Sequence, residues 1–203
     1  KPNAVKTGMI ATIEMMELIA DYFKKYRAIP YCLDPVMVAT SGDVLMEEAS
    51  QMAIKKRLVP LATVVTPNLS ETEILVGKEV TTIKAMEEAA IEIVKELGAQ
   101  TAVVKGGHLE GGAIDVFYDG DQIHHLTSER FDTPHTHGTG CTFSAVITAE
   151  LAKGKSVLEA VKQGKVYITD AIRYSLKLGK GNGPTNHWGY RLKGLPNERG
   201  HSK

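Results

Sequence analysis

The sequence contains few cysteines, few aromatic residues and no excess of charge of either sign. Among its 203 residues are 2 cysteines and 1 tryptophan, and Lys plus Arg equal Asp plus Glu at 24 each. A chain without net charge exerts no global attraction on nucleic acid or on an anionic membrane surface. We therefore expect no nucleic-acid or membrane partner, and any affinity for an anionic ligand has to be local.

Long hydrophobic runs and several common motifs are also absent. No apolar run reaches the length of a transmembrane helix and no signal peptide opens the sequence, so the cytoplasm is the expected location. No Gly-x-x-x-x-Gly-Lys-Ser/Thr sequence occurs, which excludes the P-loop NTPases, and no Gly-x-Gly-x-x-Gly follows a first strand. The two cysteines do not suggest a secreted disulfide scaffold, and Cys32, inside an apolar run, is expected to be a buried core thiol.

The composition that is present fits a globular domain, with 43% hydrophobic and 24% charged residues. Strand patterns are expected at residues 4–7, 29–33, 62–65 and 101–105, with a hairpin over 113–126 around Asp119-Gly120. Helical patterns are expected at residues 12–26, 47–58, 70–76, 83–97, 141–151 and 157–176. Strands that alternate with helices predict an α/β fold, a three-layer αβα sandwich around a mainly parallel sheet.

Local signals mark several boundaries in this pattern. Thr12 is the candidate N-cap of the first helix, Ser70 and Glu73 have the spacing of a capping box, and Gly77 is the expected stop of that short helix. One domain is expected over residues 1–190, followed by a disordered polar tail at 191–203.

The segment HTHGTGC at residues 135–141 is the most informative of the chain. Gly138 and Gly140 permit a tight turn, and a turn that leads into a helix leaves several backbone N–H groups pointing one way, at the positive end of the helix dipole. Such an arrangement binds phosphate. Cys141 lies at its mouth, where a thiol is acidified. The segment therefore predicts phosphoryl chemistry.

Polar residues also follow the ends of three expected strands. Asp34 follows one strand, Asn68 and Glu71 follow the next, and Lys105 with Gly107 ends a third. Ligands of a parallel α/β sheet bind beyond the carboxyl ends of its strands, so these residues are expected at one edge.

Each of these residues also has a purely structural interpretation. Glu71 alone would be a favourable charge in a first helical turn, but together with Asn68 it favours a hydrated Mg²⁺ site. Asp34 is equally consistent with a turn former, with a partner of a basic residue and with a functional carboxylate. Lys105, beside two glycines that allow close backbone approach, is a candidate phosphate contact rather than a solvent-exposed lysine.

Six segments occur in a fixed order: KTGM at 6–9, DPVMVA at 34–39, TPNLSE at 66–71, VKGGH at 104–108, THGTGCT at 136–142 and GPTNH at 183–187. Together they resemble the bacterial hydroxymethylpyrimidine/phosphomethylpyrimidine kinases of thiamine biosynthesis, members of the ribokinase-like superfamily. The resemblance covers residues 1 to about 190. It implies a ribokinase-like fold and phosphorylation by ATP and Mg²⁺ of 4-amino-5-hydroxymethyl-2-methylpyrimidine and then of its monophosphate.

The resemblance also implies roles for the residues of the glycine-rich segment. Gly138, Thr139, Gly140 and Cys141 would form the anion hole for the transferring phosphoryl group. Most ribokinase relatives carry an aspartate base where this branch has Cys141, so Cys141 is a candidate base, although a dissociative transfer needs little base assistance.

At the strand ends, the same resemblance implies that Asp34 and Glu71 serve the metal and phosphate region. It implies that Asn68 and Lys105 contact the ATP phosphates, next to the backbone of Gly107. On the last helix Lys165 would line the nucleotide pocket, and Met9 would lie against the pyrimidine. The expected partners are ATP, Mg²⁺ and a small pyrimidine, with a homodimer as the candidate assembly.

The sequence departs from the family pattern at its start. It begins without Met, and it lacks the family's opening strand, a Gly-Ser-Asp segment and a substrate-contacting glutamine. We therefore expect an interrupted chain that starts roughly where the first third of the family pattern ends.

Two other functions stay open. A pyridoxal kinase of the same branch shares the glycine-rich loop, but such relatives often carry a second cysteine where this sequence has Ala39, and ATSGD at 39–43 is more similar to the pyrimidine kinases. A non-catalytic nucleotide-binding protein is the other alternative, favoured by the missing segment.

Overall fold

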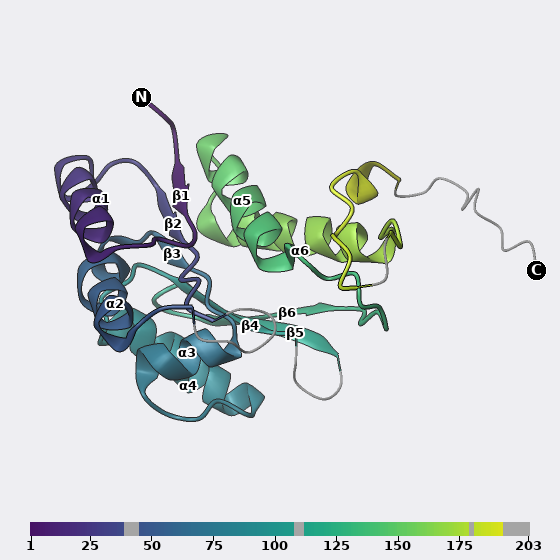
Figure 1. The fold of residues 1–203 in the computed structure, drawn as a ribbon, viewed down its shortest axis with the longest axis horizontal. Helices are drawn as coiled ribbons and strands as arrows, with labels where there is room; N and C mark the ends of the chain where they lie inside the picture. Colours follow the sequence, from purple (N-terminus) through teal and green to yellow (C-terminus); the bar gives the residue numbers. More distant parts are fainter. Residues whose placement is uncertain (39–44, 108–111, 179–180, 193–203) are drawn as a thin grey trace, which may run out of the picture.

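A six-stranded sheet forms the centre of the computed structural model, which describes residues 1–38, 45–107, 112–178 and 181–192 (Figure 1). The strands lie side by side in chain order: β1 (Val5–Thr7), β2 (Tyr31–Leu33), β3 (Val64–Val65), β4 (Ala102–Gly106), β5 (Ala113–Tyr118) and β6 (Ile123–Ser128). Strands β1 to β4 are parallel, and β4, β5 and β6 are antiparallel. The segment 39–43, His108 and the expected tail from residue 193 onward lie outside the described residues.

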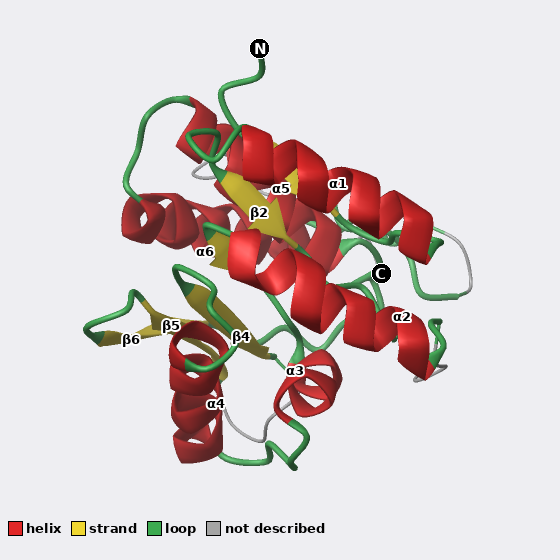
Figure 2. Ribbon diagram, turned by 90° about the vertical axis from the view of Figure 1, so that its left-hand side faces the viewer, coloured by secondary structure: helices red, strands yellow, loops and turns green. Residues whose placement is uncertain are grey.

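Helices cover both faces of this sheet. The helices are α1 (Ile13–Lys25), α2 (Glu48–Ala53), α3 (Leu69–Val76), α4 (Ile83–Lys95), α5 (Thr139–Ala152) and α6 (Val157–Arg173). Figure 2 shows α1 and α2 side by side over β2, while α5 and α6 lie on the opposite face. The expected three-layer α/β sandwich with a mainly parallel sheet is therefore confirmed.

Two hydrophobic cores form because successive residues of a strand point to opposite faces. Tyr31 and Leu33 of β2 are fully buried in the core under α1 to α4, whereas Cys32 between them belongs to the core under α5 and α6. In β4, Val103 and Val104 divide between the two cores in the same way. The buried Cys32 thiol is as expected from the sequence.

Local signals placed some boundaries correctly and others not. Thr12 is confirmed as an N-cap, since its hydroxyl accepts a hydrogen bond from the Met15 N–H, and Gly77 ends α3 in the left-handed conformation with φ 73°. The capping box expected at Ser70 was wrong. Helix α3 begins earlier, and Asn68 and Glu71 form the box instead, because their side chains and backbone N–H groups bond reciprocally at 2.8 Å.

Three helix ends also differ from expectation. Helix α5 begins at Thr139 rather than at 141, which brings Gly140 into the first turn. Helix α6 stops at Arg173 rather than at 176, where the carbonyl groups of Ala171 and Tyr174 accept hydrogen bonds from Asn186. In the segment 47–58, where one helix was expected, only α2 is α-helical. The chain continues from α2 as a π-helical turn at Ile54–Leu58. Pro60 follows two residues later and has no N–H to donate.

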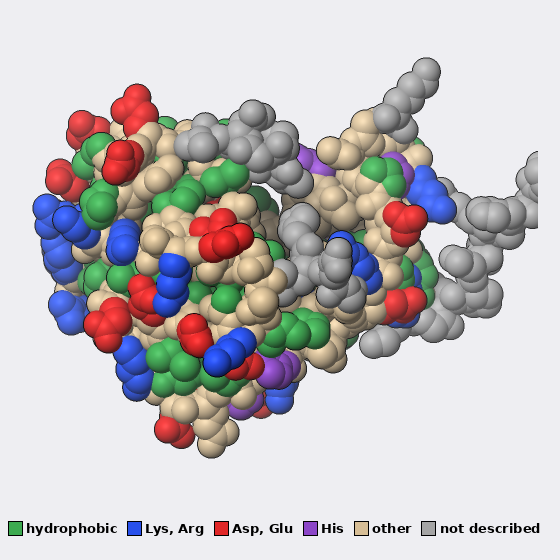
Figure 3. Space-filling view, turned by 90° about the horizontal axis from the view of Figure 1, so that it is seen from below, with side chains coloured by type: hydrophobic (Ala, Val, Ile, Leu, Met, Phe, Trp, Pro, Cys, Tyr) green, Lys and Arg blue, Asp and Glu red, His purple; other side chains and the backbone are tan. Residues whose placement is uncertain are grey.

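The face of the protein seen in Figure 3 carries both acidic and basic side chains. Among the described helices, none combines the length and the hydrophobicity needed to cross a bilayer. With equal numbers of acidic and basic residues in the sequence, the charges that matter for a site are those of particular side chains at the carboxyl ends of the parallel strands.

Candidate active site

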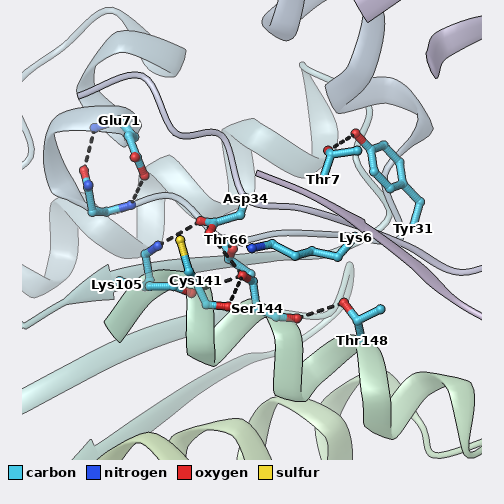
Figure 4. Close-up of polar contacts among 12 residues, drawn as sticks. Lys6, Thr7, Tyr31, Asp34, Thr66, Glu71, Lys105, Cys141, Ser144 and Thr148 are labelled. Atoms are coloured by element: carbon cyan, nitrogen blue, oxygen red, sulfur yellow. Dashed lines mark hydrogen bonds and ion pairs between the residues drawn. The ribbon is translucent and has the colours of Figure 1, made fainter. Parts of the chain in front are cut away.

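Polar side chains from five separate segments, among them Lys6 of β1, meet near the carboxyl ends of the parallel strands and the start of α5 (Figure 4). Asp34 directly follows β2, and Thr66 follows β3. Lys105 lies near the end of β4, and Ser144 lies in the second turn of α5. The edge predicted from the strand ends thus exists.

Asp34 is the centre of this group and is only 1% exposed. Its Oδ1 lies 3.2 Å from the Nζ of Lys105 and accepts a hydrogen bond of 3.3 Å from the Thr66 hydroxyl. Its Oδ2 accepts a 3.0 Å hydrogen bond from the Ser144 hydroxyl and lies 3.7 Å from the Nζ of Lys6. Two cations and two hydroxyls therefore fix the orientation of this carboxylate.

The two charges at the centre stabilise each other. Burial alone would raise the pKa of Asp34, but the ammonium groups of Lys105 and Lys6 outweigh it and hold that pKa below its ordinary value. Burial alone would lower the pKa of Lys105, but the carboxylates of Asp34 and Glu71 raise it instead. Both groups are therefore ionised at neutral pH.

Glu71 serves the backbone in this structure. Its Oε2 accepts from the Asn68 N–H within the capping box, and the side chain is only 2% exposed. Burial raises the pKa of Glu71 above its ordinary value, with Lys105 acting in the opposite direction. The Lys105 N–H donates to the Pro67 carbonyl at 2.9 Å, so the start of α3 is joined to the strand that carries the lysine.

The sequence predicts an anion cradle at Gly138 to Cys141, and this segment, which we call the cradle, forms the start of α5. Gly138 is the N-cap with φ 82°, a conformation that side chains disfavour. The Thr139 N–H donates to the Thr136 carbonyl, whereas the N–H groups of Gly140 and Cys141 meet no acceptor among the described residues. A Cβ on Gly140 would stand 3.1 Å from the Nζ of Lys105, so the ammonium lies against the cradle.

Cys141 is exposed in the first turn of α5, whereas Cys32 is fully buried. Burial raises the pKa of the Cys32 thiol to about 12, with a hydrogen bond from Thr148 acting in the opposite direction. The two thiols therefore differ in their access to solvent.

Three other predicted residues lie in different surroundings. The Nζ of Lys165 donates to Asp115 Oδ2 at 2.8 Å and to the Ala113 carbonyl at 3.0 Å, so its described contacts do not include the Asp34 cluster or the cradle. Met9 lies two residues beyond β1 with 61% of its surface exposed, and Gly107 directly follows β4. Their roles toward ligands stay predictions.

The site also includes residues that the sequence reasoning missed. Lys6, Thr66 and Ser144 all contact Asp34. A signal existed for Lys6, a lysine next to the end of an expected apolar strand, and for Ser144, which lies one helical turn after Cys141. Asp115 gave no comparable signal, because an aspartate in a hairpin strand is usually a solvent-facing residue.

Known structures share this fold and are similar to this chain in sequence. A Bacillus subtilis pyridoxal kinase in complex with ADP is 45% identical, with a TM-score of 0.85 over 94% of this chain and 71% of its own. The Staphylococcus aureus pyridoxal kinase in complex with AMP-PCP and pyridoxal is 38% identical, with a TM-score of 0.85 over 93% of this chain and 68% of its own. The fold and the site therefore define a ribokinase-like kinase of small molecules.

Sequence comparison specifies the family further. The phosphomethylpyrimidine kinase family model matches residues 1–186, and the chain belongs to that family. A hydroxymethylpyrimidine/phosphomethylpyrimidine kinase of Staphylococcus aureus strain MSSA476 is 45% identical over 200 residues, which are 97% of this chain and 72% of that relative.

The thiols provide a direct test of the site's geometry. We expect N-ethylmaleimide to modify one thiol per native chain, at Cys141, and two after unfolding in guanidinium, because Cys32 is buried and its pKa is about 12. Intact-mass spectrometry and peptide mapping count and locate the adducts. Native Cys141→Ser should take none, and an adduct on Cys32 of the native protein would contradict the structure.

Proposed function

We propose that the protein transfers the terminal phosphoryl group of ATP to the hydroxymethyl group of 4-amino-5-hydroxymethyl-2-methylpyrimidine, and then phosphorylates the monophosphate. One observation carries this proposal: the ammonium of Lys105 lies against a helix start whose Gly140 and Cys141 N–H groups have no acceptor among the described residues. Such donors match the charge that spreads over a transferring phosphoryl group.

The cradle and Lys105 bind and orient the phosphates in this mechanism. The free N–H groups donate to phosphoryl oxygens, and the ammonium neutralises their charge without a proton transfer. Asp34 keeps the lysine and the start of α5 in register, because Lys105 and Ser144 both donate to its carboxylate. Loose phosphoryl transfer is catalysed mainly by positioning and charge stabilisation, which these groups supply.

Asp34 and Glu71 are the candidate carboxylates for a Mg²⁺ ion that arrives with the nucleotide. Within the described ranges no cluster of three or more Asp, Glu, His or Cys side chains could hold a metal alone. Mg²⁺ commonly takes one or two carboxylates together with phosphate oxygens, and Asp34 and Glu71 are buried carboxylates that both act on Lys105. They would hold the ion, which would neutralise phosphate charge when bound.

Substrate preference is the test of this function, because pyridoxal kinases are among the similar structures. The chain should phosphorylate the hydroxymethylpyrimidine with a kcat/KM about tenfold above that for pyridoxal, a difference within reach of pocket contacts. ADP release in a coupled assay with ATP and Mg²⁺ measures both substrates. A higher kcat/KM for pyridoxal would favour the second function, and ATP binding without transfer to either would favour a non-catalytic protein.

Cys141 is the proposed base for the substrate hydroxyl. We expect Cys141→Ala to lower kcat by about tenfold to a hundredfold, at the low end of general-base effects, because a loose transition state needs little proton removal. The thermal midpoint should stay near that of the wild type, since Cys141 is exposed. Cys32→Ala is the matched control and should change stability more than kcat, and unchanged turnover in Cys141→Ala would contradict the role.

Three expectations about the whole molecule stay proposals: one domain over residues 1–190, a cytoplasmic location and a homodimer. The outer face of α1 supports the dimer, since Met15 and Leu18 are 48% and 72% exposed. Glu14 lies in the first turn and Lys25 in the last, so two antiparallel copies of α1 would match opposite charges. Leu18→Glu should convert the dimer to monomer in sedimentation velocity, and a wild-type monomer would refute it.

A further inference from the structure

A buried ion pair lies between α6 and the β4–β5 hairpin. The Nζ of Lys165 lies 2.8 Å from Asp115 Oδ2, and the two residues are 8% and 6% exposed. The same ammonium donates to the Ala113 carbonyl, at the first residue of β5. A buried ion pair is weak support for stability, because removing two charges from water offsets their attraction. A role in positioning therefore has to be considered.

The second oxygen of Asp115 binds the strand that carries the site lysine. Asp115 Oδ1 accepts a 3.1 Å hydrogen bond from the Gly106 N–H, directly after Lys105. Gly106 is also tightly enclosed, because a Cβ there would stand 2.3 Å from the Ile114 carbonyl oxygen and 2.6 Å from Met86 Cε. The backbone beside Lys105 is therefore fixed by a hydrogen bond and by close packing.

Asp115 is also the direct partner of Lys105 across the sheet. Residues directly opposite in an antiparallel pair project to the same face, so the carboxylate lies next to the lysine stem. The Asp115 charge is among those that raise the pKa of Lys105. Without a cation of its own, this carboxylate would compete with phosphate for the Lys105 ammonium.

We propose that Asp115 and Lys165 are positioning residues of the phosphoryl-transfer site. Asp115 holds the Gly106 backbone, and with it Lys105, against the cradle, while Lys165 cancels the charge of Asp115 so that this support does not oppose an anionic ligand. Lys165 acts through Asp115 and does not contact the nucleotide. The inference rests on the proposed function. It gives Lys165 a role different from the one that the family resemblance implies, in which Lys165 lines the nucleotide pocket.

A rescue experiment separates the two roles of Lys165. Isothermal titration calorimetry with Mg²⁺ and AMP-PCP measures nucleotide affinity without turnover. Lys165→Met leaves the Asp115 charge uncompensated and should raise Kd by about tenfold. Adding Asp115→Asn removes that charge, keeps an oxygen that accepts from the Gly106 N–H, and should bring Kd within about threefold of the wild type. A double variant as weak as Lys165→Met alone would overturn the proposal, because a lost direct contact cannot be restored in this way.

Two controls exclude a general effect on folding. The pair Lys78–Glu92, with an N–O distance of 2.7 Å, joins the segment after α3 to α4, and Lys78→Met with Glu92→Gln should leave Kd unchanged. Lys165→Arg keeps the charge, and its Kd should stay closer to the wild-type Kd than that of Lys165→Met.

In a Lys105→Met background, Lys165→Met should weaken binding much less than tenfold, because its effect passes through Lys105. An undiminished effect there would contradict the proposal.

Amide hydrogen exchange keeps this test independent of the proposed function. If the wild type binds AMP-PCP but phosphorylates neither substrate, the kinase proposal fails, and the rescue experiment still tests whether Asp115 and Lys165 are positioning residues. If the wild type binds no nucleotide, hydrogen exchange at the Gly106 N–H tests the same proposal. Asp115→Ala should speed that exchange by at least about tenfold relative to the wild type, whereas Lys165→Met with Asp115→Asn should keep it protected. Equal exchange in Asp115→Ala and the wild type would refute the positioning.

Discussion

The buried carboxylate of Asp34 is the interaction on which the site depends. It joins β2, where it follows the strand, to β4 through Lys105 and to α5 through Ser144, and these partners lie 71 and 110 residues away in the chain. A buried charge is stable only when it is paired and hydrogen-bonded, so the sheet and α5 must hold their relative positions for Asp34 to stay ionised. The same contacts that satisfy this charge place the lysine at the helix start.

The two faces of the sheet differ in how many polar groups they bury. The α1–α4 face is a continuous apolar core, and its helices begin and end with ordinary local caps such as Thr12 and Gly77. The α5–α6 face has a smaller core and also carries Lys105, Asp115 and Lys165 beside the unpaired start of α5. The polar groups whose burial costs free energy are thus concentrated on the face where we propose that the phosphates bind.

Much of the fold and part of the site follow from local sequence signals. The alternation of strands and helices predicts the layered sheet, and Gly138 and Gly140 predict a turn into a helix to within two residues of its start, since both signals depend on neighbouring residues alone. The Asp34–Lys105 pair and the contacts of Lys165 depend on strand order and register, which connect residues far apart in sequence. The capping box shows that local signals alone do not always place a helix start. Ser70 and Asn68 are both candidate N-caps, and the structure uses Asn68.

The uncapped start of α5 has a consequence for the lifetime of the protein. An ordinary N-cap side chain would satisfy the helix donors permanently, but Gly138 has none, so an anion seated there completes a structural element that the chain leaves open. A ligand bound only by the folded state at a hundred times its Kd adds about 2.7 kcal/mol to stability. The protein with bound nucleotide should therefore resist heat and proteolysis better than the ligand-free protein.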